Sequence, residues 1–116
     1  MKSDLCQRMF PFSLRVLKVC RELERKDGTA RTIGRQLLRA GTSVGANVEE
    51  AQGSQSRADF ASKYAIARKE ARETHHWLRL IAAAGIIPET RLRDLLKECG
   101  ELIAIMTAIV KKLKKP

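Results

Sequence analysis

The chain has 116 residues and a formal net charge of +10 at pH 7, with 44% hydrophobic and 4% aromatic residues. This length suits one domain and is too short for two, and the hydrophobic share is too high for a disordered chain. Because helix formers such as Ala, Leu, Arg, Lys and Glu dominate, we expect an all-α fold.

The positive charge indicates an anionic partner. A compact protein with this much like charge repels itself unless a partner compensates the charge. Nucleic acid is the first such partner that the composition suggests, followed by an anionic membrane surface or an acidic protein. A basic protein without any of these partners would have the same composition.

The cysteines and the apolar runs indicate the cellular compartment in which we expect the protein. Cys6, Cys20 and Cys99 are odd in number, widely spaced and without a Cys-x-x-Cys motif, which predicts neither a disulfide framework nor a zinc site. No apolar run reaches the roughly 18 residues of a membrane span, and the amino terminus lacks a signal-sequence pattern. We expect a cytoplasmic protein with no membrane partner.

The first two periodic segments predict helices over residues 11–26 and 30–52. Pro11 suits a first-turn position of the first helix, and Asp27-Gly28-Thr29 ends it. Gly34, Gly41 and Gly45 lie inside the second helix at a cost of about 1 kcal/mol each, so we expect a neighbouring backbone to come close there. The apolar row of the second helix is Ile33, Leu37, Ala40, Val44, Val48 and Ala51.

The third segment predicts a long helix from Ser56 to about residue 84. Ser56 and Asp59 resemble a capping box at its start, and Gly85 with Pro88 marks its end. A heptad seam runs along its length. The seam consists of Phe60, Tyr64, Ala67, Ala71, Thr74, Leu78 and Ile81.

The fourth segment is apolar at helical spacing from residue 92 to residue 113 and ends in the basic tail 111–116. Four helices with short connections predict an antiparallel up-down-up-down four-helix bundle, with residues 1–116 as a single domain. Ile66, Trp77 and Leu80 form a second apolar face beside the seam of the third helix. This face predicts an oligomer interface between copies of the chain.

A catalytic or metal site is the weaker interpretation. Glu73 and His76 make one Glu-x-x-His motif, but His75 and His76 are the only histidines, so the second motif of a di-metal bundle is missing. No Ser or Cys lies where a His and a carboxylate must meet it. We expect no enzymatic activity and no cofactor, and a metal-binding bundle remains the minor alternative.

Basic side chains form the candidate binding surface. Spacings of four and seven residues place arginines in rows on the second and third helices, where they could follow a phosphate backbone, although solvated charged faces are common. The scarcity of aromatic residues favours backbone-directed rather than base-specific binding. The candidates are Arg31, Arg35 and Arg39; Arg68, Arg72 and Arg79; and Lys111, Lys112, Lys114 and Lys115.

Three polar residues stand beside the apolar rows. Asn47 and Glu50 flank the row of the second helix, and Glu73 flanks the seam of the third. Polar groups at helix contacts must be paired, and an arginine of a neighbouring helix or subunit suits them. We interpret the three as a structural polar framework rather than an active site.

These motifs together resemble a known family. Its members carry a Ser-Ile/Val-x-x-Asn-Ile/Val-x-Glu-Gly run, a Ser-x-x-Asp/Glu-Phe helix start, and an Ala and a Glu in the third helix. The matching residues are Ser43, Val44, Asn47, Val48, Glu50, Ser56, Asp59, Phe60, Ala67 and Glu73. The set resembles the four-helix-bundle proteins encoded in intervening sequences of bacterial large-subunit ribosomal RNA genes. Ala51 departs from the usual glycine.

The resemblance implies an antiparallel four-helix bundle that assembles as a homopentamer. The family also includes the accessory variability determinant of diversity-generating retroelements, a basic bundle that associates with a reverse transcriptase and with nucleic acid. We therefore expect an oligomeric accessory protein that binds nucleic acid, with RNA as the first choice and a reverse transcriptase or RNA-processing machine as a possible partner. A module that binds an acidic protein is the alternative.

Overall fold

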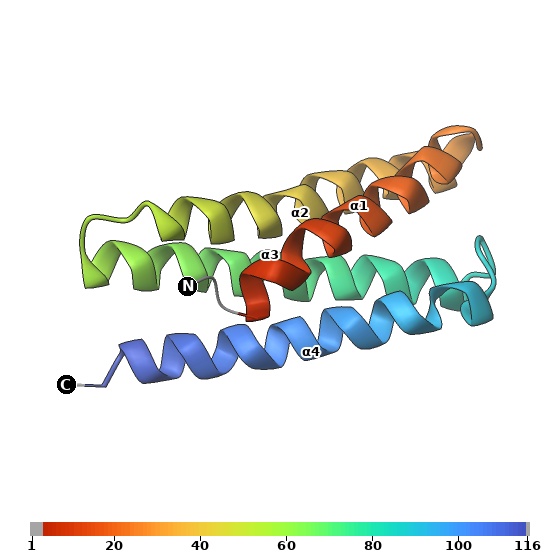
Figure 1. Cartoon of the computed structure of the whole chain (residues 1–116). Coiled ribbons are helices and arrows are strands. Elements are labelled where there is room, and N and C mark those ends of the chain that lie inside the picture. The colour runs from red at the N-terminus through yellow and green to blue at the C-terminus, as the bar shows by residue number, and fades with distance from the viewer. Residues whose placement is uncertain (1–3, 116) are drawn as a thin grey trace.

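The computed structural model describes residues 4–115, and this part of the chain folds into four α-helices without a strand. The helices are α1 (Asp4–Glu24), α2 (Gly28–Gln52), α3 (Arg57–Ala83) and α4 (Glu89–Leu113). Successive helices run in opposite directions and form an elongated body of 48 × 23 × 21 Å (Figure 1). The prediction of an all-α, up-down-up-down bundle is confirmed.

Each helix buries one row of side chains. On α3, the predicted seam from Tyr64 to Ile81 is almost fully buried, whereas Phe60 is half-buried at its start. Across residues 4–115 no helix is both long enough and apolar enough to cross a membrane. Packing of amphipathic faces, rather than helix propensity, therefore supplies most of the stability.

The ends of α3 follow the predicted local chemistry. The Ser56 hydroxyl accepts a hydrogen bond from the backbone N–H of Asp59 at 3.0 Å, which satisfies one of the unpaired first-turn amides. Gly85 has φ 72°, and the N–H of Ile86 donates to the carbonyl of Ile81 at 3.1 Å. This is a Schellman ending, in which glycine supplies the left-handed residue.

The first helix begins earlier than the sequence predicts. It starts at Asp4 rather than near Pro11, which therefore lies inside the helix and not in its first turn. Leu5 and Met9 are buried and extend the apolar row of Phe12 towards the amino terminus. The burial of these two side chains offsets the hydrogen bond that a helix loses at an internal proline.

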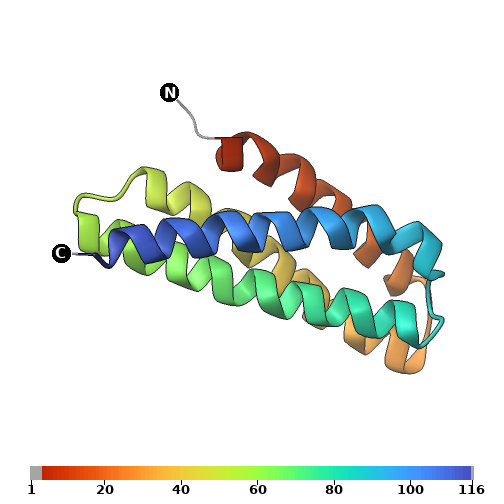
Figure 2. The ribbon, with the colours of Figure 1, turned by 90° about the horizontal axis from the view of Figure 1, so that it is seen from below.

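The second helix approaches α1 through its glycines. A Cβ atom on Gly41 would lie 2.5 Å from Val16 Cγ1, and one on Gly34 would lie 2.8 Å from Leu23 Cβ. Side-chain atoms of α1 therefore occupy the space beside these glycines, where the sequence predicted a neighbouring backbone. Figure 2 shows α1 inclined to the other three helices.

Candidate nucleic-acid interface

The arginines of α3 form a compact row. At about 100° per residue, the positions of Arg68, Arg72 and Arg79 fall within about 40° of one another around the helix. Arg72 and Arg79 are exposed and Arg68 is half-buried. Within residues 4–115, no carboxylate forms an ion pair with any of the three. Their guanidinium groups are therefore available to an anionic ligand.

His75 lies on α3 between Arg72 and Arg79 and is half-buried. Burial lowers its pKa below the usual 6.5, and the positive charge of Arg79 lowers it further. Both effects favour the neutral imidazole at pH 7, and protonation at lower pH would add a positive charge beside the arginine row.

The arginines of α2 have internal partners instead. Arg31 Nε donates to the backbone carbonyl of Lys26 at 3.1 Å, and Arg35 lies 3.7 Å from the Glu24 carboxylate on α1. Arg39 turns to the other side, towards α3. The predicted row is thus divided between two neighbouring helices.

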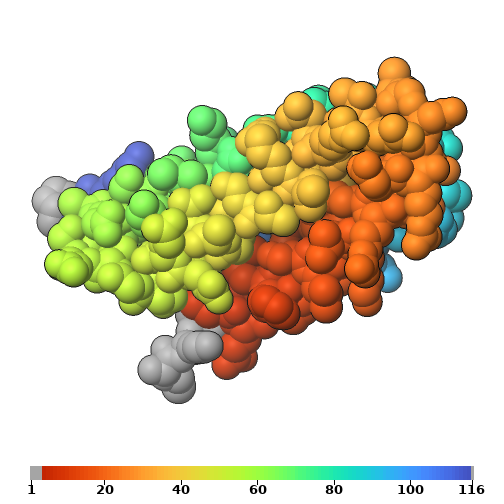
Figure 3. Space-filling model, turned by 90° about the horizontal axis from the view of Figure 1, so that it is seen from above, coloured from red at the N-terminus to blue at the C-terminus, as the bar shows by residue number. Residues whose placement is uncertain are grey.

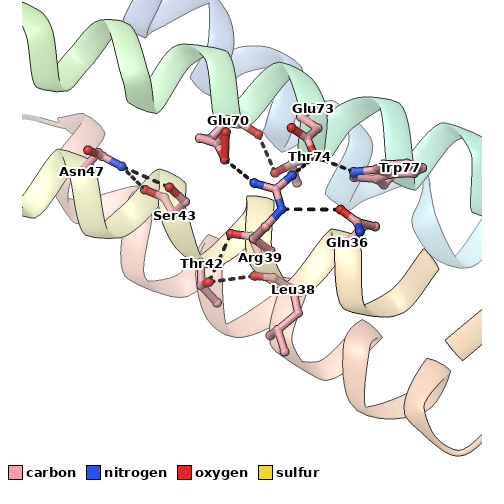
Figure 4. Close-up of polar contacts among 10 residues, drawn as sticks. All are labelled: Gln36, Leu38, Arg39, Thr42, Ser43, Asn47, Glu70, Glu73, Thr74 and Trp77. Atoms are coloured by element: carbon pink, nitrogen blue, oxygen red, sulfur yellow. Dashed lines mark hydrogen bonds and ion pairs between the residues drawn. The ribbon is translucent and has the colours of Figure 1, made fainter. Parts of the chain in front are cut away.

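Arg39 is the centre of an ion-pair cluster between α2 and α3 (Figure 4). It donates to Glu70 at 3.1 Å and also to Glu73, and Trp77 Nε1 donates to the same Glu73 carboxylate at 3.0 Å. Glu70 is only 9% exposed, and a buried carboxylate requires a partner of opposite charge. Arg39 therefore holds the two helices together.

Sequence analysis missed Glu70 as a member of this cluster. Its position gave one signal: it lies three residues after Ala67 and four before Thr74, both on the buried seam. A carboxylate at such a position is either paired or neutral. The pairing residue on α2 could not be chosen without the packing of the two helices.

The three residues of the predicted polar framework have different surroundings. Glu73 has the expected arginine partner, Arg39. Asn47 donates instead to the backbone carbonyl and the hydroxyl of Ser43, within α2. Glu50 is exposed and lies 3.8 Å from Lys63 of α3. Within the described chain, an arginine therefore pairs with only one of the three.

The basic tail is attached to the start of α3. The guanidinium of Arg57 donates to the backbone carbonyls of Lys112 and Leu113, at 3.4 Å each. These contacts lie at the carbonyl end of α4, where a positive charge interacts favourably with the helix dipole. The predicted lysines Lys111, Lys112, Lys114 and Lys115 are all exposed at this end of the bundle.

Comparison with protein families matches residues 1–108 to the model described as 23S rRNA-intervening sequence protein. The chain belongs to this family. A solved structure of an S23 ribosomal protein family member of unknown function, from Bacteroides thetaiotaomicron, superposes with a TM-score of 0.85. It is 32% identical, and the match covers 92% of this chain and 98% of that one. Comparison with curated proteins finds no match.

The Glu-x-x-His motif of this intervening-sequence family member, at Glu73 and His76, has other contacts. Glu73 binds Arg39 and Trp77, so its carboxylate is already engaged. Among residues 4–115, no three His, Cys, Asp or Glu side chains are grouped as ligands of a metal ion. Burial raises the pKa of Cys99 to about 12 and that of Cys20 to about 11, which makes both thiols poor nucleophiles.

The predicted oligomer face lies on α3, beside the ion-pair cluster. Ile66 and Leu80 are 41% and 40% exposed. Trp77 is half-buried and packs against the core. Two of the three residues therefore expose apolar surface that a second copy could cover.

Two arginine–glutamate pairs connect α1 with α4 in this family member. Arg8 makes two hydrogen bonds with Glu98, at 2.9 and 2.6 Å, and Arg91 makes two with Glu22, at 3.0 and 2.6 Å. Hydrogen bonds from the arginines lower the pKa of Glu98 and of Glu22. The geometry matches the strong two-point arginine–carboxylate pair, and sequence analysis identified neither pair.

Proposed function

We propose that this protein is a non-enzymatic, oligomeric accessory protein that binds structured RNA through its phosphate backbone. The observation that carries the proposal is the row of Arg68, Arg72 and Arg79, whose guanidinium groups have no carboxylate partner in the described chain. The net charge of +10 supports it, because phosphate contacts supply most non-specific binding of nucleic acid.

The available aromatic rings support backbone contacts rather than base recognition. Tyr64 is buried, and Trp77 and Phe60 are half-buried. Phe10 is 74% exposed, but it lies on α1, whereas the arginine row lies on α3. A row of stacked bases would need several rings near the arginines. Phosphate contacts and RNA shape are therefore the expected basis of binding.

The basic tail extends this surface, and the α2 row adds less to it. Arg57 holds the end of α4 beside the start of α3, so the exposed lysines of residues 111–115 add positive charge at that end of α3. Arg35 and Arg39 already neutralise carboxylates. Releasing them for phosphate would leave those carboxylates unpaired.

The binding test compares two variants that lose the same charge. Arg68, Arg72 and Arg79 are changed together to Gln in one, and the exposed Arg15, Lys18 and Arg25 of α1 in the other. Fluorescence anisotropy with a labelled RNA hairpin measures the affinity. Three lost phosphate contacts weaken binding about a hundredfold near 0.1 M salt, and the α1 variant should lose less than about threefold. Equal losses, or no binding by the unmodified protein, would refute the proposal.

Self-association is the second part of the proposal. The exposed Ile66 and Leu80 suit an interface between copies, and the family resemblance implies a pentamer. Sedimentation velocity on Ile66→Glu and Leu80→Glu variants should show a loss of mass relative to the unmodified protein. A monomeric unmodified protein, or variants that keep its mass, would contradict this assignment.

The accessory role rests on the family resemblance, which implies a reverse transcriptase or an RNA-processing enzyme as partner. The neighbouring gene is the informative observation: a reverse transcriptase gene beside a variable repeat, or a surrounding ribosomal RNA gene, would distinguish the two roles. Co-purification of the enzyme encoded there, resistant to nuclease treatment, would support a direct partnership.

A further inference from the structure

The outer face of α1 and α2 exposes a strip of apolar side chains. Phe10, Leu14 and Leu17 lie at helical spacing on the outward side of α1 and are 74%, 44% and 37% exposed. Leu38 on α2 is 38% exposed beside them. Figure 3 shows this face, with α1 in red and orange beside α2 in yellow. Contiguous exposed apolar side chains indicate an interaction surface.

Two hollows lie between the two helices along this strip. One of about 250 Å³ lies between Met9 and Phe10 of α1 and Gly45 and Ala46 of α2. The other, of about 220 Å³, lies between Leu17 of α1 and Gly34 and Leu38 of α2. Their centres are about eleven residues apart along α2, which corresponds to roughly 16 Å.

This distance suits a helical ligand. Residues three turns apart on a helix point in the same direction and are about 16 Å apart along its axis. A helix that presents apolar side chains at positions i, i+4, i+7 and i+11 could therefore fill both hollows and cover Leu14 between them. This is the usual mode by which a groove binds an amphipathic helix.

The charge of the strip favours an acidic ligand. Lys18, Arg21 and Arg25 lie within about 60° of one another on the outward side of α1 and have no ion-pair partner in the described chain. The nearby Glu24 is already paired with Arg35. Glu49 lines the hollow beside Phe10, so the positive charge lies at the Leu17 end of the strip. A second copy of a chain with net charge +10 would meet repulsion here, whereas carboxylates would find complementary charge.

We propose that the face of α1 and α2 binds an acidic amphipathic helix of a second protein. Its apolar side chains enter the two hollows, and its carboxylates contact Lys18, Arg21 and Arg25. This site is separate from the arginine row of α3 and from the predicted oligomer face, so the protein can hold an RNA and a protein partner together. The proposal does not depend on RNA binding.

Peptide selection tests the proposal directly. Random peptides of about 20 residues, roughly 30 Å long as helices, are displayed on phage and selected against the full chain. We expect the enriched sequences to have apolar residues at i, i+4, i+7 and i+11 and an excess of Asp and Glu. The synthetic consensus peptide should bind Leu14→Gln and Arg21→Gln variants at least about tenfold more weakly. Lys97→Gln, at an exposed position of α4, should keep full affinity.

Four results would overturn the proposal. The first is a set of enriched peptides without the apolar spacing or the acidic residues, and the second is full affinity of the consensus peptide for the Leu14→Gln variant. A Leu14→Gln variant that loses mass in sedimentation would assign the face to contacts between copies. A Leu14→Gln variant that loses RNA affinity, with the arginine row intact, would assign it to nucleic acid.

Discussion

The contact between α1 and the glycines of α2 makes a sharp stability prediction. A Cβ atom on Gly41 would lie 2.5 Å from Val16 Cγ1, whereas a Cβ atom on Gly100 of α4 would have no atom within 4 Å. Both glycines lie inside helices. Replacing each with alanine therefore gives the same gain in helix propensity with opposite packing consequences.

The expected changes in the free energy of unfolding follow from helix propensity and from packing. Alanine gains about 1 kcal/mol over glycine in a helix interior, so Gly100→Ala should stabilise the protein by up to that amount. At Gly41 the added methyl group overpacks the core, which costs about 1–3 kcal/mol. Val16 is fully buried and stiff about χ1, so α1 must shift. Gly41→Ala should be about 1–3 kcal/mol less stable than Gly100→Ala.

Urea unfolding at a fixed protein concentration measures the two free energies of unfolding. A double variant, Gly41→Ala with Val16→Ala, supplies the control: the smaller side chain makes room for the methyl group, so the double variant should cost less than the sum of the single changes. If Gly41→Ala stabilises the protein as much as Gly100→Ala does, α1 is not seated on α2 as described.

Three further predictions concern the charged residues. Arg39→Gln should lower the free energy of unfolding in urea by about 1–3 kcal/mol, because it leaves Glu70 buried without a partner. Arg72→Gln should stay within about 0.5 kcal/mol of the unmodified protein. Equal losses of stability in the two variants would contradict the role of Arg39 in the ion-pair cluster. Since its folded-state pKa is lowered, Glu98 stabilises the fold above its usual pKa of 4.5, and this contribution is lost as the pH falls through the lowered value. The stability difference between the unmodified protein and Glu98→Gln should shrink in that window, and a constant difference would count against the pair. RNA affinity should rise as the pH falls below 6.5 and His75 gains charge, and a His75→Gln variant with the same rise would exclude this residue as the cause.

Much of the fold could be predicted from the sequence because its signals are local. The seam of α3, the cap at Ser56 and the left-handed Gly85 each depend on residues a few positions apart. The predicted start of α1 was wrong because Pro11 suggested the first turn of a helix. Only the packed structure shows that Leu5 and Met9 are buried and extend the helix through the proline.

The candidate site was predictable only in its composition. Helical spacing identified the arginine rows, but it could not show which arginines already have partners. Arg39 and Arg72 look alike in sequence, yet Arg39 pairs with two carboxylates of α3 and Arg72 with none in residues 4–115. Helical spacing also could not predict the pairing of Arg8 with Glu98, which are 90 residues apart in the chain. Such pairs depend on how the helices are packed, which a single helical pattern does not contain.

The salt dependence of RNA binding tests the central proposal most directly, because its slope counts the phosphates that the protein contacts. The slope of log affinity against log salt concentration changes by about 0.7–0.9 for each phosphate contact. Replacing Arg68, Arg72 and Arg79 with Gln should make the slope shallower by about 2–3, while the α1 variant with the same loss of charge should keep the slope of the unmodified protein. The same slope for the α3 variant and the unmodified protein would show that the α3 arginines do not contact the RNA backbone.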